Sequence, residues 1–437
     1  MSYSEQLLDS IQNHDFSQSK HLLKEALDKD DPEILSSLAE NLTDLGFTNL
    51  AKEVYRALIA KFPQEDLFKV YLAEIMLNDG DEDDGLSLLY GVSKESSAYL
   101  DGLLVQADYY QTNGLIETAK DKLLQALKLA PKEDAIKFGL AELDYLSGNY
   151  EQALALYEDL IQRQKTFGEV NLNQRLIATN AKLGNYEAAA KIIREHSSSL
   201  LDIDSKYEAG LVMLAVGDDD QAIKLLDEVI DQSPDYVNAY PLLAQAYEHK
   251  HDNEQVLRTV QAGLAYNELD ETLYSMGARA AANLNQLDTA ADLLEKGLKK
   301  APDNSELRMQ LSNLYLHRHQ DKQNIVLFKD FDNENIDAQA HWNMALSYER
   351  LDDTEKAQSE FLLAYPDFKE NPDFLHQMIM FFSVQNNPDI TKQLLQKYLE
   401  LVPEDMEMQD LYNNLYFASS QTLIVLKKDA GTKSNVF

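Results

Sequence analysis

The stretch "LSGNYEQALALYEDLI", residues 146–161, predicts a turn followed by an amphipathic helix. Gly148 and Asn149 are residues that favour turns. The apolar residues that follow them recur at intervals of three and four, as expected on one face of an α-helix: Ala153, Leu156, Tyr157 and Leu160. The stretch is therefore interpreted as the second half of a helical hairpin.

The same layout recurs along the chain of 437 residues. Four glycines at the turn position follow one another at intervals of 34 residues, namely Gly46, Gly80, Gly114 and Gly148. The register begins at His14 and continues at Gly184, Gly217, His251, Asn285, His319, Asp352 and Asn386. Thirty-four residues accommodate two helices of about 12–14 residues and two short turns. Twelve hairpins are expected, numbered here by their turns from His14 to Asn386.

Two further patterns follow the same register. Prolines seventeen residues after a turn predict the end of the second helix, at Pro63, Pro131, Pro234, Pro302 and Pro403. Seven residues before most turns the residue is small, as at Ala39, Ala73, Ala107 and Ala141, and nine residues after each turn it is apolar. Small residues let neighbouring helices approach closely, and the larger apolar residue fills the next gap.

These repeats resemble the tetratricopeptide repeat family, most clearly over residues 138–161 and 341–361. The resemblance implies an all-α fold: a right-handed α-solenoid of about twelve helical hairpins over residues 1–405. Residues 406–419 are expected to form a capping helix, and residues 420–437 a flexible tail. The register departs from the pattern at 162–172 and 317–337, where the array can bend. The chain resembles cytosolic repeat proteins of Gram-positive bacteria.

Composition narrows the classes of partner. The net charge of −36 repels phosphate backbones and anionic lipid, so neither nucleic acid nor a membrane is an expected partner. A basic protein or peptide suits this charge better. The sequence has no cysteine, secretory signal pattern or apolar run of about 18 residues, and a cytoplasmic location is expected.

The sequence carries no recognisable catalytic motif, so the protein is not expected to be an enzyme. The triplets "HKH" (249–251) and "HRH" (317–319) end on turn positions of the register, which favours a turn over a metal site. The acidic segment 78–85 lacks the glycine and glutamate that a calcium loop requires. No metal and no cofactor are expected.

In the family, the first helix of each hairpin lines a concave groove, which implies a set of ligand-contacting positions. Six residues before the turn, four successive hairpins carry an acidic residue, and ten residues before it they carry mainly apolar ones. The expected groove residues in this half are Glu40, Val70, Glu74, Leu104, Asp108, Phe138 and Glu142. In the remaining hairpins they are Tyr207, Leu211, Arg279, Met309, Trp342 and Leu346. The acidic ladder is also open to interpretation as a solvated face, and the apolar residues as packing between hairpins.

The expected function is a non-catalytic scaffold or adaptor that binds a protein or peptide in this groove. The N-terminal half favours a basic, partly apolar segment. The alternative is a cytosolic regulator that senses a short peptide and acts through a partner protein. The oligomeric state is left open.

Overall fold

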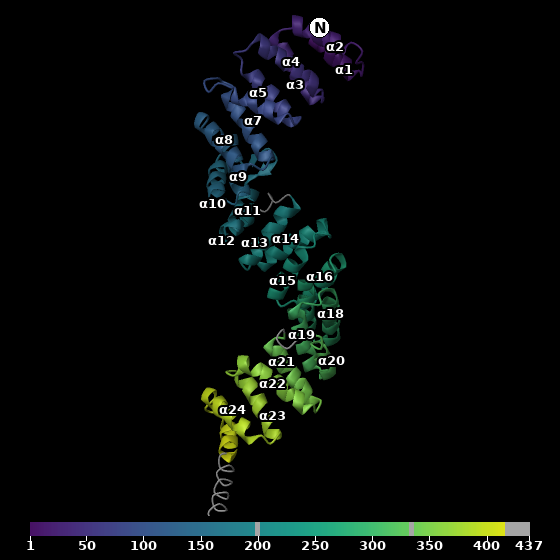
Figure 1. Ribbon diagram of the computed structural model, residues 1–437, viewed down its shortest axis with the longest axis vertical. Coiled ribbons are helices and arrows are strands. Elements are labelled where there is room, and N and C mark those ends of the chain that lie inside the picture. Colours follow the sequence, from purple (N-terminus) through teal and green to yellow (C-terminus); the bar gives the residue numbers. More distant parts are fainter. Residues whose placement is uncertain (197–201, 332–335, 416–437) are drawn as a thin grey trace, which may run out of the picture. The chain divides into compact units, whose positions relative to one another are not determined.

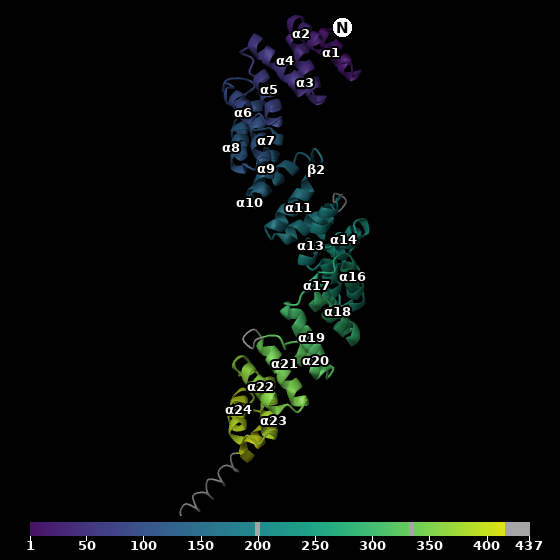
Figure 2. The same ribbon diagram turned by 45° about the vertical axis from the view of Figure 1, so that its right-hand side comes forward.

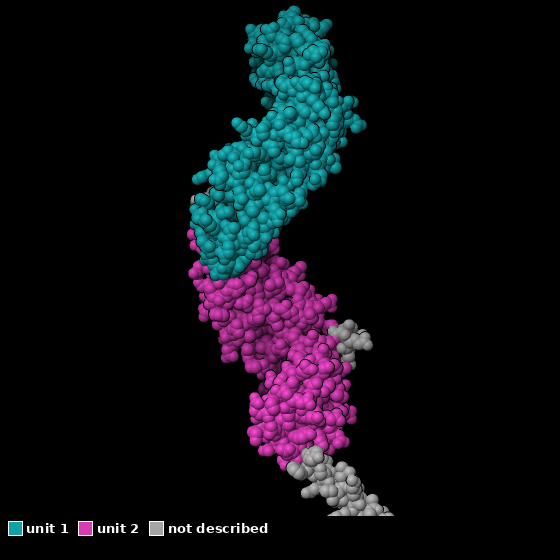
Figure 3. Space-filling model, turned by 90° about the vertical axis from the view of Figure 1, so that its left-hand side faces the viewer, with its two compact units in different colours: residues 1–218 teal, residues 219–437 magenta. Residues whose placement is uncertain are grey.

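A computed structural model describes residues 1–196, 202–331 and 336–415 (Figure 1). The chain divides into two compact units, Met1–Asp218 and Asp219–Phe437 (Figure 3). In both units nearly all described residues outside turns are helical, and the fold is an all-α solenoid of paired helices. Among the described residues, no helix is both long and apolar enough to cross a bilayer.

The first unit contains helices α1 to α13 in chain order. Their bounds are α1 Tyr3–Gln12, α2 Ser19–Lys29, α3 Pro32–Asp44, α4 Thr48–Lys61, α5 Leu67–Asn78, α6 Glu82–Tyr90, α7 Tyr99–Thr112, α8 Ile116–Leu129, α9 Asp134–Leu146, α10 Tyr150–Ile161, α11 Leu172–Lys182, α12 Tyr186–His196 and α13 Ile203–Ala215. Successive helices from α3 to α13 pack against each other, and α1 packs against both α2 and α3, so each hairpin contacts the next along the chain.

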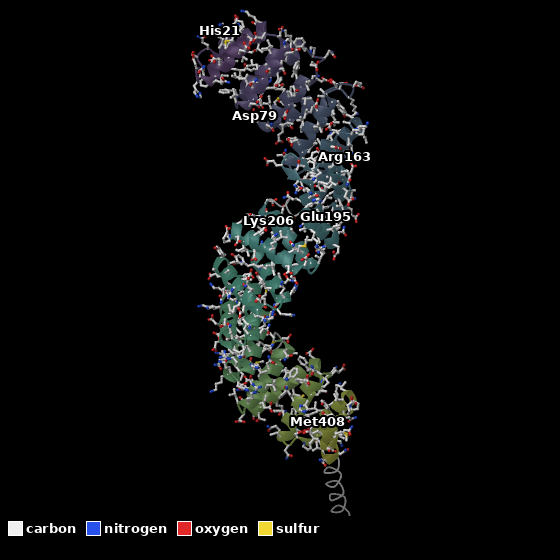
Figure 4. The ribbon with its side chains drawn as sticks, turned by 180° about the vertical axis from the view of Figure 1, so that it is seen from behind. His21, Asp79, Arg163, Glu195, Lys206 and Met408 are labelled. Atoms are coloured by element: carbon white, nitrogen blue, oxygen red, sulfur yellow. The ribbon has the colours of Figure 1, made fainter. Side chains whose placement is uncertain are left out.

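The second unit contains α14 to α24 and one further helix over residues 406–415. Their bounds are α14 Asp219–Gln232, α15 Ala239–His249, α16 Asn253–Tyr266, α17 Glu271–Asn283, α18 Leu287–Lys300, α19 Ser305–His317, α20 Asp321–Val326, α21 Ala338–Arg350, α22 Thr354–Phe368, α23 Pro372–Val384 and α24 Pro388–Leu401. Met408 on the last helix is 2 % exposed and packs on the apolar cluster of α23 and α24 (Figure 4). The expected tail, 420–437, lies outside the described residues.

All twelve expected turn residues have a left-handed backbone, which confirms the register. Six are glycines, and the others have φ between 50° and 60°: His14, His251, Asn285, His319, Asp352 and Asn386. At Gly148 the glycine N–H donates to the Tyr145 carbonyl (3.1 Å) and the Asn149 N–H to the Asp144 carbonyl (2.8 Å). This pair of bonds satisfies the last carbonyls of the first helix and reverses the chain.

The small and apolar register positions form the core between helices. In the fifth hairpin Ala141, Ala153 and Tyr157 are all 0 % exposed. The register prolines follow directly on the ends of second helices, as the sequence predicts; α8, for example, ends at Leu129, two residues before Pro131. Close helix packing at these positions therefore holds the first helices of neighbouring hairpins at a regular spacing.

The departure at 162–172 contains a small β-hairpin that the sequence analysis did not foresee. β1 (Thr166–Phe167) pairs antiparallel with β2 (Val170–Asn171), and β2 leads directly into α11 (Figure 2). The turn between the strands passes through Gly168, whose φ is +54°. A glycine accepts this conformation without the steric cost that a side chain would add.

At the departure at 317–337 the second helix is short, because α20 covers only six residues. Asn324 stands where alanine is usual and is 0 % exposed. Its side chain bonds to Ser312 Oγ (2.7 Å) and to Ser347 Oγ (2.8 Å). A buried polar network thus replaces apolar packing at this helix contact.

Candidate functional site

Three of the four expected ladder carboxylates line two adjoining pockets in the first unit. One pocket, of about 460 Å³, lies against α5 and α7 and contains Glu74 and Asp108. The other, of about 270 Å³, lies against α3 and α5 and contains Glu40 and Glu74. The pockets share Glu74 and Asn78, and together they are called the acidic groove. Its lining residues are Glu40, Thr43, Asp44, Tyr55, Tyr71, Glu74, Ile75, Leu77, Asn78, Glu82, Leu104, Val105, Asp108, Tyr109, Thr112 and Asn113.

The register explains why these carboxylates share one surface. Each follows directly on a small buried residue, Ala39, Ala73 or Ala107, which fixes the helix against its neighbour. The next residue is one-third of a turn further round the helix and comes to the edge of the packed face. Repetition of this relationship at 34-residue intervals aligns the carboxylates of α3, α5 and α7.

The charged residues that line the acidic groove are all negative. Its lining contains no lysine, arginine or histidine. Within the described part of the chain, Glu40, Glu74 and Asp108 make no hydrogen bond or ion pair. Partial burial, together with the charge of Asp108, raises the pKa of Glu74 above its usual value. The groove therefore concentrates negative charge that the protein itself does not compensate.

Tyrosines on the same surface respond to this charge. Burial, then Glu40, raises the pKa of the Tyr71 hydroxyl above its usual value, and Asp101 and Glu74 act in the same direction. The Tyr55 and Tyr71 rings lie 5.7 Å apart. The groove thus offers aromatic and apolar surface beside its carboxylates, the combination that suits a cation carried on an apolar stem.

Val70 does not belong to the groove, which corrects the sequence-based assignment. It is 0 % exposed and packs with Leu89 and Val92. Gly102 on the next first helix packs over it: a Cβ atom there would lie 3.6 Å from Val70 Cγ2, an ordinary van der Waals distance, so α7 lies directly against Val70. Leu104, at the equivalent position of the next hairpin, does line the groove.

Glu142 is also not part of the groove, because the chain itself neutralises its carboxylate. Arg175 Nη2 donates to Glu142 Oε2 (2.7 Å), and the Tyr157 hydroxyl donates to Glu142 Oε1 (2.5 Å). Phe138, ten residues before the same turn, is stacked on Phe167 of β1 with ring centroids 4.7 Å apart. The expected groove contacts of the fifth hairpin are therefore occupied by residues of the protein itself.

Sequence reasoning missed several lining residues: Asp44, Tyr55, Tyr71, Asn78, Glu82 and Tyr109. A signal for some of them was present. Asp44 and Asn78 lie four residues after a ladder carboxylate, and Tyr71 lies three residues before one. Residues three and four apart share a helix face, so extending the ladder by these offsets identifies them.

The other expected groove residues do not form one surface. Arg279 is exposed in the second unit, where it pairs with Glu248 (3.2 Å) and lines a pocket of about 450 Å³ together with Gln310 and Asn313. Tyr207 is half-buried, and Leu211 is 36 % exposed.

The three apolar candidates of the last hairpins pack between helices. Trp342 Nε1 donates to Gln377 (2.6 Å), and the ring meets Phe374 edge-on. Met309 and Leu346 pack against buried apolar clusters of the second unit. For these three side chains the structure agrees with the interpretation that they pack between hairpins rather than contact a ligand.

The histidine triplets lie on hairpin ends. His249 bonds to Asp219 (2.9 Å), while His251 and His319 adopt the left-handed turn conformation. In the described ranges, no three acidic or histidine side chains are grouped closely enough to hold a metal ion.

Comparison with known proteins identifies repeats in three parts of the chain. Residues 111–165 match YpiA-like tetratricopeptide repeats, residues 338–405 match YpiA-like C-terminal tetratricopeptide repeats, and residues 204–236 match a general tetratricopeptide repeat. The TPR repeat-containing protein YpiA of Bacillus subtilis (strain 168) is 27% identical over 353 residues, which are 80% of this chain and 83% of that protein.

Solved structures resemble the chain at low sequence identity. A structure of Naa15/Naa10 bound to HypK-THB is 14% identical, covering 89% of this chain and 66% of that one, with a TM-score of 0.43. YrrB, described as a TPR protein with an unusual peptide-binding site, is 16% identical, covering 43% of this chain and 97% of that one, with a TM-score of 0.37.

Proposed function

This chain is a tetratricopeptide-repeat protein, and we propose that it is a non-catalytic cytoplasmic scaffold that binds a basic, partly apolar segment of another protein in the acidic groove. Tetratricopeptide repeats generally mediate protein–protein interactions. The observation that carries the proposal is the alignment of Glu40, Glu74 and Asp108 in adjoining pockets without a cation of the protein's own.

Magnitudes indicate how such a groove works. An exposed ion pair contributes about 0–1 kcal/mol, so three carboxylates alone do not give tight binding. The apolar part of the lining adds about 25 cal/mol for each Å² of apolar surface that a ligand covers. Complementary charge chiefly sets the association rate and excludes acidic partners. The net charge of −36 attracts basic partners over a longer range at low ionic strength.

The direct test is selection from a random peptide library displayed on phage. The wild-type protein is expected to enrich peptides that combine basic and apolar residues. A triple variant, Glu40→Gln, Glu74→Gln and Asp108→Asn, is expected to lose that enrichment. Its matched control changes the exposed carboxylates Glu53, Glu117 and Glu158 to glutamine, which alters the net charge equally outside the groove.

The selected peptides are then synthesised and titrated by fluorescence anisotropy at several salt concentrations. Weaker binding at higher salt, present in the control and lost in the triple variant, supports the proposal. Enrichment of the same peptides by the wild-type protein and the triple variant would contradict it.

A further inference from the structure

The fifth hairpin shows how a ladder carboxylate is satisfied when a partner is present. Glu142 occupies the position six residues before its turn, and Arg175 the position nine residues before the next turn. Their side chains form an ion pair at 2.7 Å. The Arg175 guanidinium also lies 5.8 Å from the centre of the Tyr145 ring. A guanidinium group here meets a carboxylate and an aromatic ring together.

The β1–β2 hairpin adds an aromatic side chain to this arrangement. Phe167 stacks on Phe138 with an interplanar angle of 6°. Phe138 lies four residues before Glu142, so its ring belongs to the same stretch of α9 as that carboxylate. The chain therefore places one basic and one aromatic side chain of its own against the fifth hairpin.

The three preceding hairpins lack such an internal partner. The position equivalent to Arg175 lies on the following hairpin, nine residues before its turn. Opposite Glu40, Glu74 and Asp108 this position is occupied by Tyr71, Val105 and Gly139, respectively. None of these three residues carries a cation. The pockets of the acidic groove lie against α3, α5 and α7, where the neighbouring first helix offers no basic side chain, whereas the ladder carboxylate of α9 is paired with Arg175.

The second hairpin shares two register positions with the setting of Glu142 and lacks the arginine. Tyr55 and Tyr157 both lie nine residues after their turns, and Glu40 and Glu142 both lie six residues before them. Glu40, Tyr55 and Tyr71 line one pocket together. The two contacts differ, because the Tyr55 hydroxyl bonds to Ser36 rather than to Glu40, and Thr43 stands at the register of Tyr145. In the second hairpin the carboxylate and the tyrosine therefore border a pocket, and Tyr71 supplies its further aromatic ring.

We infer that Arg175 and Phe167 form an internal plug that closes the acidic groove at the fifth hairpin, and that the partner segment fills the open positions with the same chemistry, arginine side chains flanked by aromatic residues. This inference rests on the proposed function and specifies its ligand. Arginine fits better than lysine, because its planar group pairs with a carboxylate through two donors and also stacks on an aromatic ring.

The spacing of the ladder limits the form of the segment. Packed helices lie about 8–10 Å apart, so first helices of successive hairpins are separated by about 10–20 Å. An extended chain advances about 3.3 Å per residue. Arginines about three to six residues apart in an extended segment therefore reach successive carboxylates.

The probes for this inference are end-capped synthetic peptides of three kinds. The first contains two Arg-Phe pairs separated by four residues of glycine and serine. The second replaces both arginines by lysine, and the third replaces them by glutamate. Wild-type protein is expected to bind the arginine peptide at least about threefold more tightly than the lysine peptide, and the glutamate peptide least.

Transplanting the plug provides the sharper test. Val105→Arg places an arginine opposite Glu74 at the register of Arg175, and it is expected to weaken binding of the arginine peptide at least about tenfold. Val105→Met changes the size of the side chain without adding charge and is the matched control. Circular dichroism melting establishes that both variants are folded.

Removing the plug gives the reciprocal test. Arg175→Gln frees the Glu142 carboxylate, and Phe167→Ala uncovers Phe138 without altering any charge. Each is expected to strengthen binding of a longer peptide with three Arg-Phe pairs by about two- to fivefold, while binding of the two-pair peptide stays unchanged.

The outcomes separate this inference from the proposed function. If arginine and lysine peptides bind the wild-type protein equally, or if Val105→Arg binds like Val105→Met, the inference is overturned while a basic ligand remains supported. If the glutamate peptide binds as well as the two basic peptides, the proposed function itself fails.

Discussion

Lys52 Nζ on α4 lies 2.8 Å from a carboxylate oxygen of Asp79. Asp79 directly follows the end of α5 and is labelled in Figure 4. The ammonium group also pairs with Asp81 at 2.7 Å, beyond the turn at Gly80. The Lys52 side chain is only 7 % exposed, whereas Asp79 is partly open to water. One buried cation therefore ties the second hairpin to the turn of the third, next to the acidic groove.

Replacing Lys52 by methionine is expected to destabilise this pair of hairpins by about 1–3 kcal/mol, because two carboxylates lose their shared donor. Methionine retains the apolar stem and so isolates the loss of the charge. The urea midpoint, followed by circular dichroism, measures the effect. Lys24→Met, at an exposed position, serves as the control and is expected to shift the midpoint little. Equal midpoints for the two variants would contradict the prediction.

The ion pair between Lys52 and Asp79 also predicts that the free energy of unfolding decreases at acidic pH. The hydrogen bond from Lys52 holds the pKa of Asp79 below its usual value. A carboxyl group with a lowered folded-state pKa stabilises the fold above its unfolded pKa of about 3.9, and this contribution disappears as the pH falls through the folded value. Urea midpoints between pH 7 and pH 3 are expected to fall less steeply below pH 4 in Lys52→Met than in wild type. Parallel curves would show that Asp79 does not contribute.

Glu74 predicts a pH dependence of binding that lies at higher pH, because its pKa is shifted in the opposite direction to that of Asp79. Because burial and Asp108 raise its pKa, Glu74 takes up a proton at a higher pH than an ordinary glutamate. Affinity for the arginine peptide is therefore expected to decrease as the pH is lowered from 7 towards 5. In Glu74→Gln, binding is weaker at pH 7 and flatter over this range. Anisotropy titrations measure both curves, and identical slopes would exclude Glu74 as the responsible group.

The turns predict opposite effects of two substitutions. Gly148 has φ +77°, so Gly148→Ala is expected to cost about 1–2 kcal/mol. Asn285 adopts φ +57° with a side chain, and Asn285→Gly is expected to be neutral or stabilising. Urea unfolding of each variant provides the measurement. Destabilisation by Asn285→Gly comparable to that of Gly148→Ala would refute the backbone explanation.

The buried side-chain amide of Asn324 predicts a loss of stability in the second unit that depends on its hydrogen-bond partners. Asn324→Ala removes the acceptor of the Ser312 hydroxyl and the donor to Ser347 Oγ, both residues 0 % exposed, and is expected to cost about 1–3 kcal/mol. A triple variant with Asn324, Ser312 and Ser347 all changed to alanine is expected to be more stable than Asn324→Ala alone, since neither buried hydroxyl remains. The Asn343 amide, which also donates to Ser312 Oγ, keeps its bond to Asn313 Oδ1 (2.7 Å). Chemical unfolding of single and triple variants decides this, and a less stable triple variant would contradict the argument.

The features that local sequence determines were predictable. Turn register, helix ends and the small buried positions depend on residues within one hairpin, and the left-handed conformation of His251 and Asp352 follows from register alone. The ladder Glu40, Glu74 and Asp108 was predictable for the same reason. What fills the groove beside it depends on the next hairpin and required the structure.

Two corrections show this dependence. Val70 is buried because α7 of the next hairpin, at Gly102, packs against it. Glu142 is paired because the next first helix carries Arg175, which no pattern within the fifth hairpin indicates. The β1–β2 strands were missed because two-residue strands have too few residues to show an alternating pattern.

The amide of Asn324 has a consequence for assembly of the chain. A protein made of similar hairpins can fold with a hairpin seated beside the wrong neighbour. In the preceding hairpin, the positions equivalent to Ser312 and Asn324 are Ala278 and Ala290. An exchanged neighbour would leave the amide enclosed by methyl groups, at a cost of about 1–3 kcal/mol. The polar contact therefore favours the correct pairing of these two neighbouring hairpins, whereas the apolar contacts between other hairpins do not distinguish one neighbour from another.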